Sequence, residues 1–142
     1  MILWRISEFV TLDGRGGMVV DGRWHRRGRP IVYLAEMGSL AILEARAHIE
    51  ADVPETFQLL KVEAPDDLAI HQWTDHGDVR ERNRTQDWGS RWLGSGGSAL
   101  ARVPSVIAPA EFNILLNPLH RDAERVKIVE ARRWPWDDRL FR

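Results

Sequence analysis

The chain has 142 residues, with 20 basic and 21 acidic side chains and a formal net charge of −1. This length fits a single domain, residues 1–142, and the near-zero charge offers no general attraction to nucleic acid or to an anionic membrane. The lack of cysteine excludes disulfides, thiolate nucleophiles and cysteine metal sites. No stretch approaches the length of an apolar membrane span. We expect a soluble cytoplasmic protein in which any anion site is local.

Short strands and two helices are predicted along the chain, with glycine-rich loops between some of them. Ser39 occupies the position of a helix N-cap before the apolar periodicity that begins at Leu40. In chain order we predict a loop at 13–17, a strand at 31–35, a helix at 40–51, strands at 56–64 and 68–73, a helix at 85–93, a loop at 94–98, and strands at 101–107, 112–117 and 125–131. Strands and helices that do not alternate regularly indicate an α+β fold of mixed short-strand sheets with flanking helices, not a doubly wound sheet.

The stretch "VDGRWHRRGRPIVYLAE" at 20–36 places five basic side chains directly before a predicted strand. A solvated turn and a socket for phosphate both fit this composition. The glycine patterns of phosphate-binding loops are absent, and five scattered histidines form no metal-ligand spacing. The basic residues of the stretch are Arg23, His25, Arg26, Arg27 and Arg29.

The helix predicted at 40–51 carries a carboxylate at the edge of its apolar stripe. A period of 3.6 residues groups Leu40, Leu43 and Ala47, with Glu44 beside them. His48 lies one turn after Glu44, so a simple ion pair on a half-exposed face is one interpretation. The other is that Glu44 lies at the wall of a pocket near the strand at 31–35.

Three polar side chains in apolar surroundings are further candidates. Tyr33, the only tyrosine, is either a core aromatic with a satisfied hydroxyl or part of that pocket. Ser105 lacks the G-x-S-x-G context of a hydrolase nucleophile, so its hydroxyl is a hydrogen-bond donor or is structurally satisfied. Asn113 lies in the run "EFNILLNP", which ends in a predicted turn at Asn117 and Pro118.

Taken in order, these stretches resemble the RES-domain toxins of bacterial toxin–antitoxin pairs. The resemblance covers nearly the whole chain, from "WRIS" through "GRWHRRGRPIVYLAE", "LAILEARAHIE" and "VPSVIAPAEFNILLNPLH" to "WDDRLF". The segment "HRR" is more basic than usual in this family, and "DDRL" replaces a common ending that contains proline. Neither difference affects the four residues that match the family's motif, which are Arg23, Tyr33, Glu44 and Ser105.

The resemblance implies a fold similar to the ADP-ribosyltransferases and NAD⁺ as substrate, and the scattered histidines predict no metal. It implies that the four matched residues are catalytic and that Arg5, Arg23, Tyr33 and Asn113 bind NAD⁺. A bidentate guanidinium at Arg23 suits the pyrophosphate. Tyr33 could stack on nicotinamide, Glu44 could stabilise an oxocarbenium ion, and Ser105 could orient the nicotinamide amide or the ribose.

We expect an NAD⁺ glycohydrolase or phosphorylase that cleaves the nicotinamide–ribose bond with water or phosphate. Two alternatives stay open, a mono-ADP-ribosyltransferase that modifies a protein and a catalytically silent module, either nucleotide-binding or without a pocket. The family further implies a helix-turn-helix (Xre-type) antitoxin that blocks the active site. We expect no direct nucleic-acid or membrane partner, and the sequence leaves open whether the chain forms a homodimer.

Overall fold

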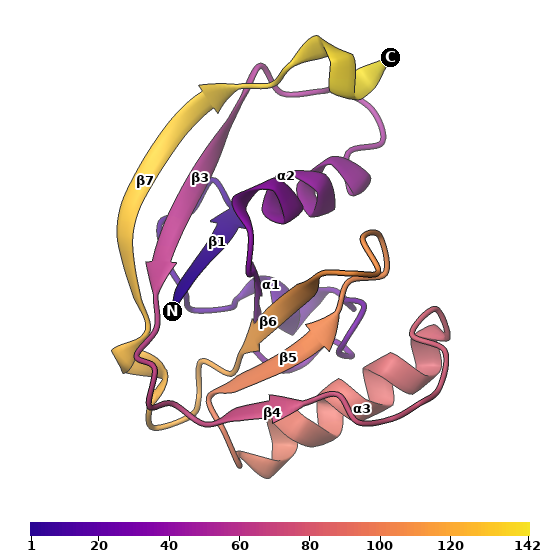
Figure 1. Cartoon of the computed structure of the whole chain (residues 1–142), viewed down its shortest axis with the longest axis vertical. Coiled ribbons are helices and arrows are strands. Elements are labelled where there is room, and N and C mark those ends of the chain that lie inside the picture. The colour runs from indigo at the N-terminus through magenta and orange to yellow at the C-terminus, as the bar shows by residue number, and fades with distance from the viewer.

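A seven-stranded mixed sheet organises the chain, and the computed structural model describes all 142 residues (Figure 1). The strand order is β4-β5-β6-β2-β1-β3-β7, and every neighbouring pair is antiparallel except β4 and β5. This confirms the predicted α+β class. The strands are β1 (Ile2–Ile6), β2 (Val32–Ala35), β3 (Thr56–Glu63), β4 (Ile70–Gln72), β5 (Leu100–Pro104), β6 (Phe112–Leu116) and β7 (Lys127–Pro135).

Three α-helices, α1 (Gly16–Val19), α2 (Gly38–Ala47) and α3 (Arg82–Ser95), and two 3₁₀ turns, Ala123–Arg125 and Asp138–Phe141, complete the fold. Part of the loop predicted at 13–17 is therefore helical. The N-cap prediction for Ser39 is wrong, because α2 begins at Gly38, two residues before the predicted start at Leu40, and Met37 is its extended cap. No helix is both long enough and apolar enough to cross a membrane.

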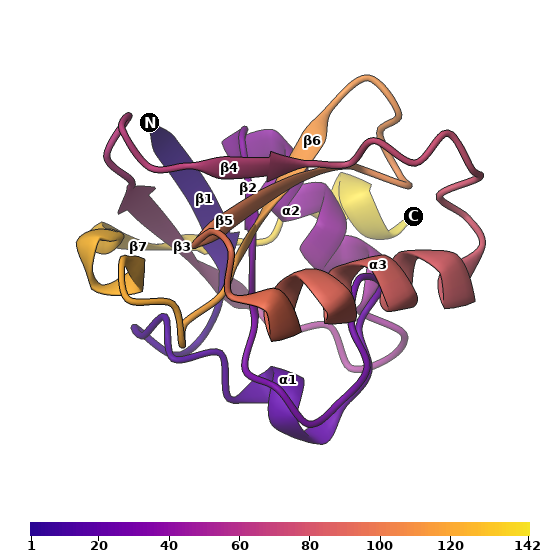
Figure 2. The ribbon, with the colours of Figure 1, turned by 90° about the horizontal axis from the view of Figure 1, so that it is seen from below.

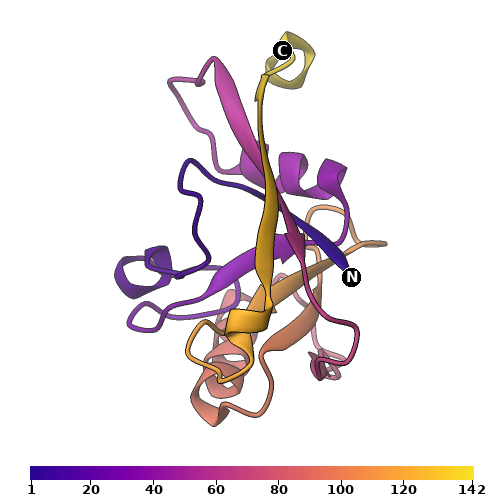
Figure 3. The ribbon, with the colours of Figure 1, turned by 90° about the vertical axis from the view of Figure 1, so that its left-hand side faces the viewer.

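The sheet consists of two parts that meet between β1 and β2. Their only paired position there is Trp4 with Ala35, whereas β3 and β7 pair along almost their full lengths. Figure 3 shows β3 and β7 as a long arm that leads to the C-terminal 3₁₀ turn. The largest buried cluster joins both parts and includes Leu3, Val32, Leu34, Leu60, Val62, Leu100, Ile114 and Leu116.

The opposite face of the central strands carries the helices. Figure 2 shows α3 running beneath β4 and β5, and the buried side chains of α3 pack with Trp24 against β5 and β6. Gly89 is required in α3 because any side chain there would collide with the carbonyl of Trp24. The indoles predicted to share one helix face, Trp88 and Trp92, are both buried in this contact.

Helix α2 packs on the same face through Leu40 and Ala41, beside Ala35 of β2. The predicted stripe of Leu40, Leu43 and Ala47 is wrong in part, because Leu43 is 40% exposed and Ala47 is also exposed. The buried face of α2 is therefore formed by Leu40 and Ala41, and not by Leu43 or Ala47. Because Glu44 follows Leu40 and Ala41 by four and three residues, it lies on the side that faces the sheet.

Candidate active site

The carboxylate of Glu44 is held by two side chains from the sheet. Its Oε1 accepts hydrogen bonds from the Ser105 hydroxyl and from the Asn113 amide nitrogen, each at 2.9 Å. Ser105 and Asn113, which follow Glu44 by 61 and 69 positions in the chain, therefore fix the Glu44 side chain on α2. The predicted ion pair with His48 is wrong: the His48 ring nitrogen Nδ1 lies 2.8 Å from the backbone carbonyl of Glu44, at the end of the helix. We call Glu44, Ser105 and Asn113 the carboxylate cluster.

Ser105 lies directly after β5 and is buried, and its hydroxyl group makes every hydrogen bond that it can donate or accept. Its oxygen accepts the backbone N–H groups of Ile107 at 3.2 Å and Ala108 at 3.0 Å, while its proton goes to Glu44. A hydroxyl that donates to a carboxylate and accepts twice has a fixed orientation. Both sequence interpretations of Ser105 are therefore correct, since its hydroxyl is satisfied and also acts as a donor.

The second oxygen of Glu44 has no hydrogen-bond partner in the chain, and the side chain is only partly buried. Both bonds from the sheet reach Oε1, so Oε2 keeps its full capacity to accept a hydrogen bond. An anchored carboxylate with one free oxygen can bind a hydroxyl group or face a developing positive charge.

Tyr33 belongs to a second buried network. Its hydroxyl oxygen accepts the backbone N–H of Trp24 at 3.0 Å and lies 2.7 Å from Nδ1 of His25, whose Nε2 lies 3.2 Å from the carbonyl of Gly17. A carbonyl only accepts, so Nε2 carries the His25 proton and Tyr33 donates to Nδ1. We call Tyr33, His25 and Trp24 the tyrosine cluster. The prediction that the Tyr33 hydroxyl is satisfied is confirmed. Because the hydroxyl is occupied, any contact of Tyr33 with a ligand would be made by its ring.

Burial shifts the pKa of both Tyr33 and His25. It raises the pKa of the Tyr33 phenol, against the hydrogen bond from Trp24 and the positive charges of Arg82 and Arg23. It lowers the pKa of His25, against the hydrogen bond to Gly17. Both side chains are therefore neutral near pH 7, which is the state that this hydrogen-bond arrangement requires.

The two clusters share one face of the sheet. In the pairing of β2 with β6, Tyr33 lies opposite Leu115 and Ala35 lies opposite Asn113. Tyr33 and Asn113 are therefore diagonal neighbours, for which the usual separation is roughly 7–8 Å. Tyr33 thus lies on the same sheet face as Asn113, the residue that anchors Glu44.

The basic turn divides into one half-buried arginine and several exposed ones. The guanidinium of Arg23 has no partner, whereas Arg26 pairs with Asp87 at the surface. Gly22 abuts the Tyr33 hydroxyl so closely that a side chain there would collide with it, which places Arg23 at the tyrosine cluster. The solvated-turn interpretation therefore holds for Arg26, Arg27 and Arg29, and Arg23 is left as the candidate for anion binding.

Arg5 approaches the site from the other side of the sheet. It shares a face of β1 with Leu3, and its guanidinium donates to the backbone carbonyl of Tyr33 at 3.0 Å. Its Nε is buried without a partner, and burial lowers its pKa. The structure thus connects Arg5 to the backbone of Tyr33.

His25 was grouped with the basic residues of a turn that is either solvated or phosphate-binding, but it is buried, with only 2% of its surface exposed. Its position next to Trp24 was the available signal, because Trp24 anchors this part of the turn in the core. No three side chains of His, Cys, Asp or Glu gather closely enough to hold a metal ion.

The chain resembles known proteins along nearly its whole length. A family model described as "RES domain" matches residues 2–137. A protein named Toxin Res from Pseudomonas putida is 41% identical, over 99% of this chain and 100% of that protein. Prs ADP-ribosylating toxin from Sphingobium is 36% identical, over 98% and 96% of the two chains. The crystal structure of the M. tuberculosis MbcT–MbcA toxin–antitoxin complex contains a chain with the same fold, at a TM-score of 0.76 and 16% identity over 94% of this chain and 84% of that one.

Proposed function

Because this chain belongs to the RES domain family, we propose that it is the toxin of a bacterial toxin–antitoxin pair and that it degrades NAD⁺. Three of its relatives are named Toxin Res, at 34–41% identity. The observation that carries the chemical part of the proposal is the Glu44 carboxylate, which is anchored through Oε1 and free at Oε2.

The reaction breaks the N-glycosidic bond between nicotinamide and ribose. The bond electrons leave with nicotinamide, and the ribose carbon acquires oxocarbenium character. Glu44 stabilises this charge, directly or by accepting a hydrogen bond from the ribose 2-hydroxyl. Attack by water gives ADP-ribose and a proton, and attack by phosphate gives ADP-ribose phosphate. In either case neutral nicotinamide is the leaving group.

The other matched residues bind and orient in this proposal. The Tyr33 ring stacks on nicotinamide while its hydroxyl stays bonded to His25. Arg23 binds the pyrophosphate, and Arg5 supports the substrate site through the Tyr33 backbone. Ser105 and Asn113 hold Glu44 in place. This assignment moves Ser105 and Asn113 from direct substrate contact, as the resemblance implied, to positioning of the carboxylate.

A second candidate is transfer of ADP-ribose to a protein. It is favoured by the 36% identity to a relative named an ADP-ribosylating toxin. The same carboxylate would serve, because both reactions share the departure of nicotinamide and differ only in the nucleophile.

Product analysis separates these candidates. Purified protein is incubated with NAD⁺ in buffers with and without phosphate, and the products are identified by mass spectrometry. We expect nicotinamide with ADP-ribose or its phosphate. ADP-ribose attached to a protein in place of these products would establish the transferase, and release of no nicotinamide would support a silent binding module.

We also propose a helix-turn-helix antitoxin as partner, supported by the toxin–antitoxin complex among the proteins of the same fold. The partner would cover the face that carries Arg23, Tyr33 and Glu44, with the exposed basic residues after Trp24 at the rim. Expression of the chain alone should arrest growth while NAD⁺ falls, and coexpression with the neighbouring gene should prevent both effects. Abundant, folded protein without growth arrest would contradict this.

A further inference from the structure

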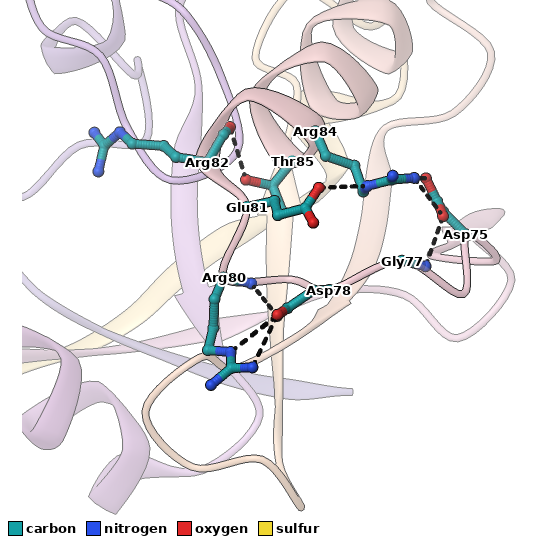
Figure 4. Close-up of polar contacts among 8 residues, drawn as sticks. All are labelled: Asp75, Gly77, Asp78, Arg80, Glu81, Arg82, Arg84 and Thr85. Carbon is teal, nitrogen blue, oxygen red and sulfur yellow. Dashed lines mark hydrogen bonds and ion pairs between the residues drawn. The ribbon is translucent and has the colours of Figure 1, made fainter.

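Three arginines alternate around the start of α3, with Arg80 just before the helix and Arg82 and Arg84 in its first turn, and only the middle one lacks an acidic partner. Figure 4 shows Arg80 bonded to the carboxylate of Asp78 and Arg84 bonded to Asp75 and Glu81, with nitrogen–oxygen distances of 2.9–3.2 Å. The guanidinium of Arg82 extends away from these carboxylates, and its only bond in the view joins its backbone carbonyl to the Thr85 hydroxyl.

The face of α3 that carries Arg82 packs against the turn at Gly22 and Arg23. One helical turn after Arg82, the Thr85 hydroxyl donates to the carbonyl of Arg23 at 2.6 Å and the Gln86 amide donates to the carbonyl of Gly22 at 3.0 Å. Residues three and four apart share a helix face, so Arg82 lies on the side that faces this turn.

This places two cations without acidic partners at the tyrosine cluster. Gly22 abuts the Tyr33 hydroxyl, and the positive charges of Arg82 and Arg23 both act on that phenol, whose pKa burial raises. Neither of the carboxylates nearest in sequence bonds to Arg23 or Arg82, since Asp21 accepts the backbone N–H of Arg27 and Glu81 accepts from Arg84.

We propose that Arg82 is a second phosphate-binding residue, which together with Arg23 holds the pyrophosphate of a dinucleotide whose other end lies at Tyr33 and Glu44. This inference rests on the proposed function. Two neighbouring cations repel each other unless an anion lies between them, and a pyrophosphate carries one negative charge for each. A planar guanidinium can bond two phosphate oxygens at once.

The matched comparison is Arg82→Ala against Arg80→Ala. Both side chains are exposed and two residues apart, but Arg80 is neutralised by Asp78. We expect Arg82→Ala to weaken ADP-ribose binding in calorimetry by about tenfold, and Arg80→Ala to leave it within about twofold, since a hydrogen bond to a charged group contributes on that scale. The melting temperature of both variants should stay close to that of the wild type.

Kinetics with NAD⁺ give a second readout. A phosphate contact exists before and during bond cleavage, so Arg82→Ala should raise KM by about tenfold and leave kcat nearly unchanged. Arg82→Lys should recover part of the loss, because it keeps the charge without the planar fork.

The outcomes separate the two proposals. If the wild type binds ADP-ribose and cleaves NAD⁺ but Arg82→Ala matches it in affinity and KM, the assignment of Arg82 is wrong and the proposed function stands. If the wild type neither binds ADP-ribose nor releases nicotinamide, the proposed function fails and the assignment of Arg82 fails with it.

Discussion

Replacement of Glu44 by glutamine removes the charge of the proposed catalytic group while keeping its anchoring contacts. The Ser105 hydroxyl and the Asn113 amide both donate to Oε1, and the amide oxygen of glutamine can accept both bonds. Alanine would instead leave two donors without an acceptor, at a cost of about 1–3 kcal/mol each. The loss of charge assistance should cost the Gln variant only about 1 kcal/mol of folding stability, or roughly 2–6 °C in melting temperature.

The effect on NAD⁺ cleavage should be much larger. The free Oε2 becomes an amide nitrogen, which donates hydrogen bonds and cannot stabilise an oxocarbenium ion. We expect kcat to fall by about two to four orders of magnitude, equivalent to about 2.7–5.4 kcal/mol of transition-state stabilisation. Nicotinamide release, measured by liquid chromatography, gives the rate. Glu50→Gln is the control, because it removes an exposed carboxylate just beyond α2. A folded Glu44→Gln variant with near wild-type turnover would refute the role of Glu44.

Three further predictions concern the tyrosine cluster and its arginines. Tyr33→Phe should lower the free energy of unfolding by about 1–3 kcal/mol in denaturant titrations, because Trp24 and His25 lose a buried partner. It should keep NAD⁺ turnover within about tenfold, because the ring remains. A large loss of kcat without destabilisation would show that the hydroxyl acts on substrate. Arg23→Ala should weaken NAD⁺ binding by at least about tenfold and Arg26→Ala, which loses an exposed ion pair, by less than about threefold; equal losses in a calorimetric titration would favour diffuse steering over a phosphate clamp. Burial lowers the pKa of His25 below its ordinary value of 6.5, so the stability that His25 contributes is complete above that pH and is lost as the pH falls through the folded-state pKa. Melting temperatures measured from about pH 8 to pH 5 should show this decline. The decline should be smaller in His25→Gln.

Local patterns predicted most of the fold because each element carried its own signal. The β-branched and aromatic run before Ala35 predicted β2, and the paired tryptophans at Trp88 and Trp92 marked the buried face of α3. Helix ends were less certain, since capping depends on tertiary contacts. At α2 the extended Met37 took the place expected for Ser39, and the His48 ring bonded the Glu44 carbonyl where the helix was expected to continue.

The site was predictable as a set of residues, whereas its contacts were not. Matching the family's motif singled out Glu44 and Ser105, but nothing local indicates that a serine 61 positions away donates to the carboxylate. The tyrosine cluster depends in the same way on a turn that folds back onto β2. Arg82 carried no signal at all, because it is one of three alternating arginines and only the ion pairs of the other two set it apart.

Stoichiometric release of nicotinamide from NAD⁺ tests the central claim most directly. Purified wild-type protein, at a concentration far below that of NAD⁺, should release one nicotinamide for each NAD⁺ consumed over many turnovers, and the Glu44→Gln variant at the same concentration should release almost none. NAD⁺ that stays intact in the presence of folded wild-type protein, or that is lost equally with both proteins, would contradict the account.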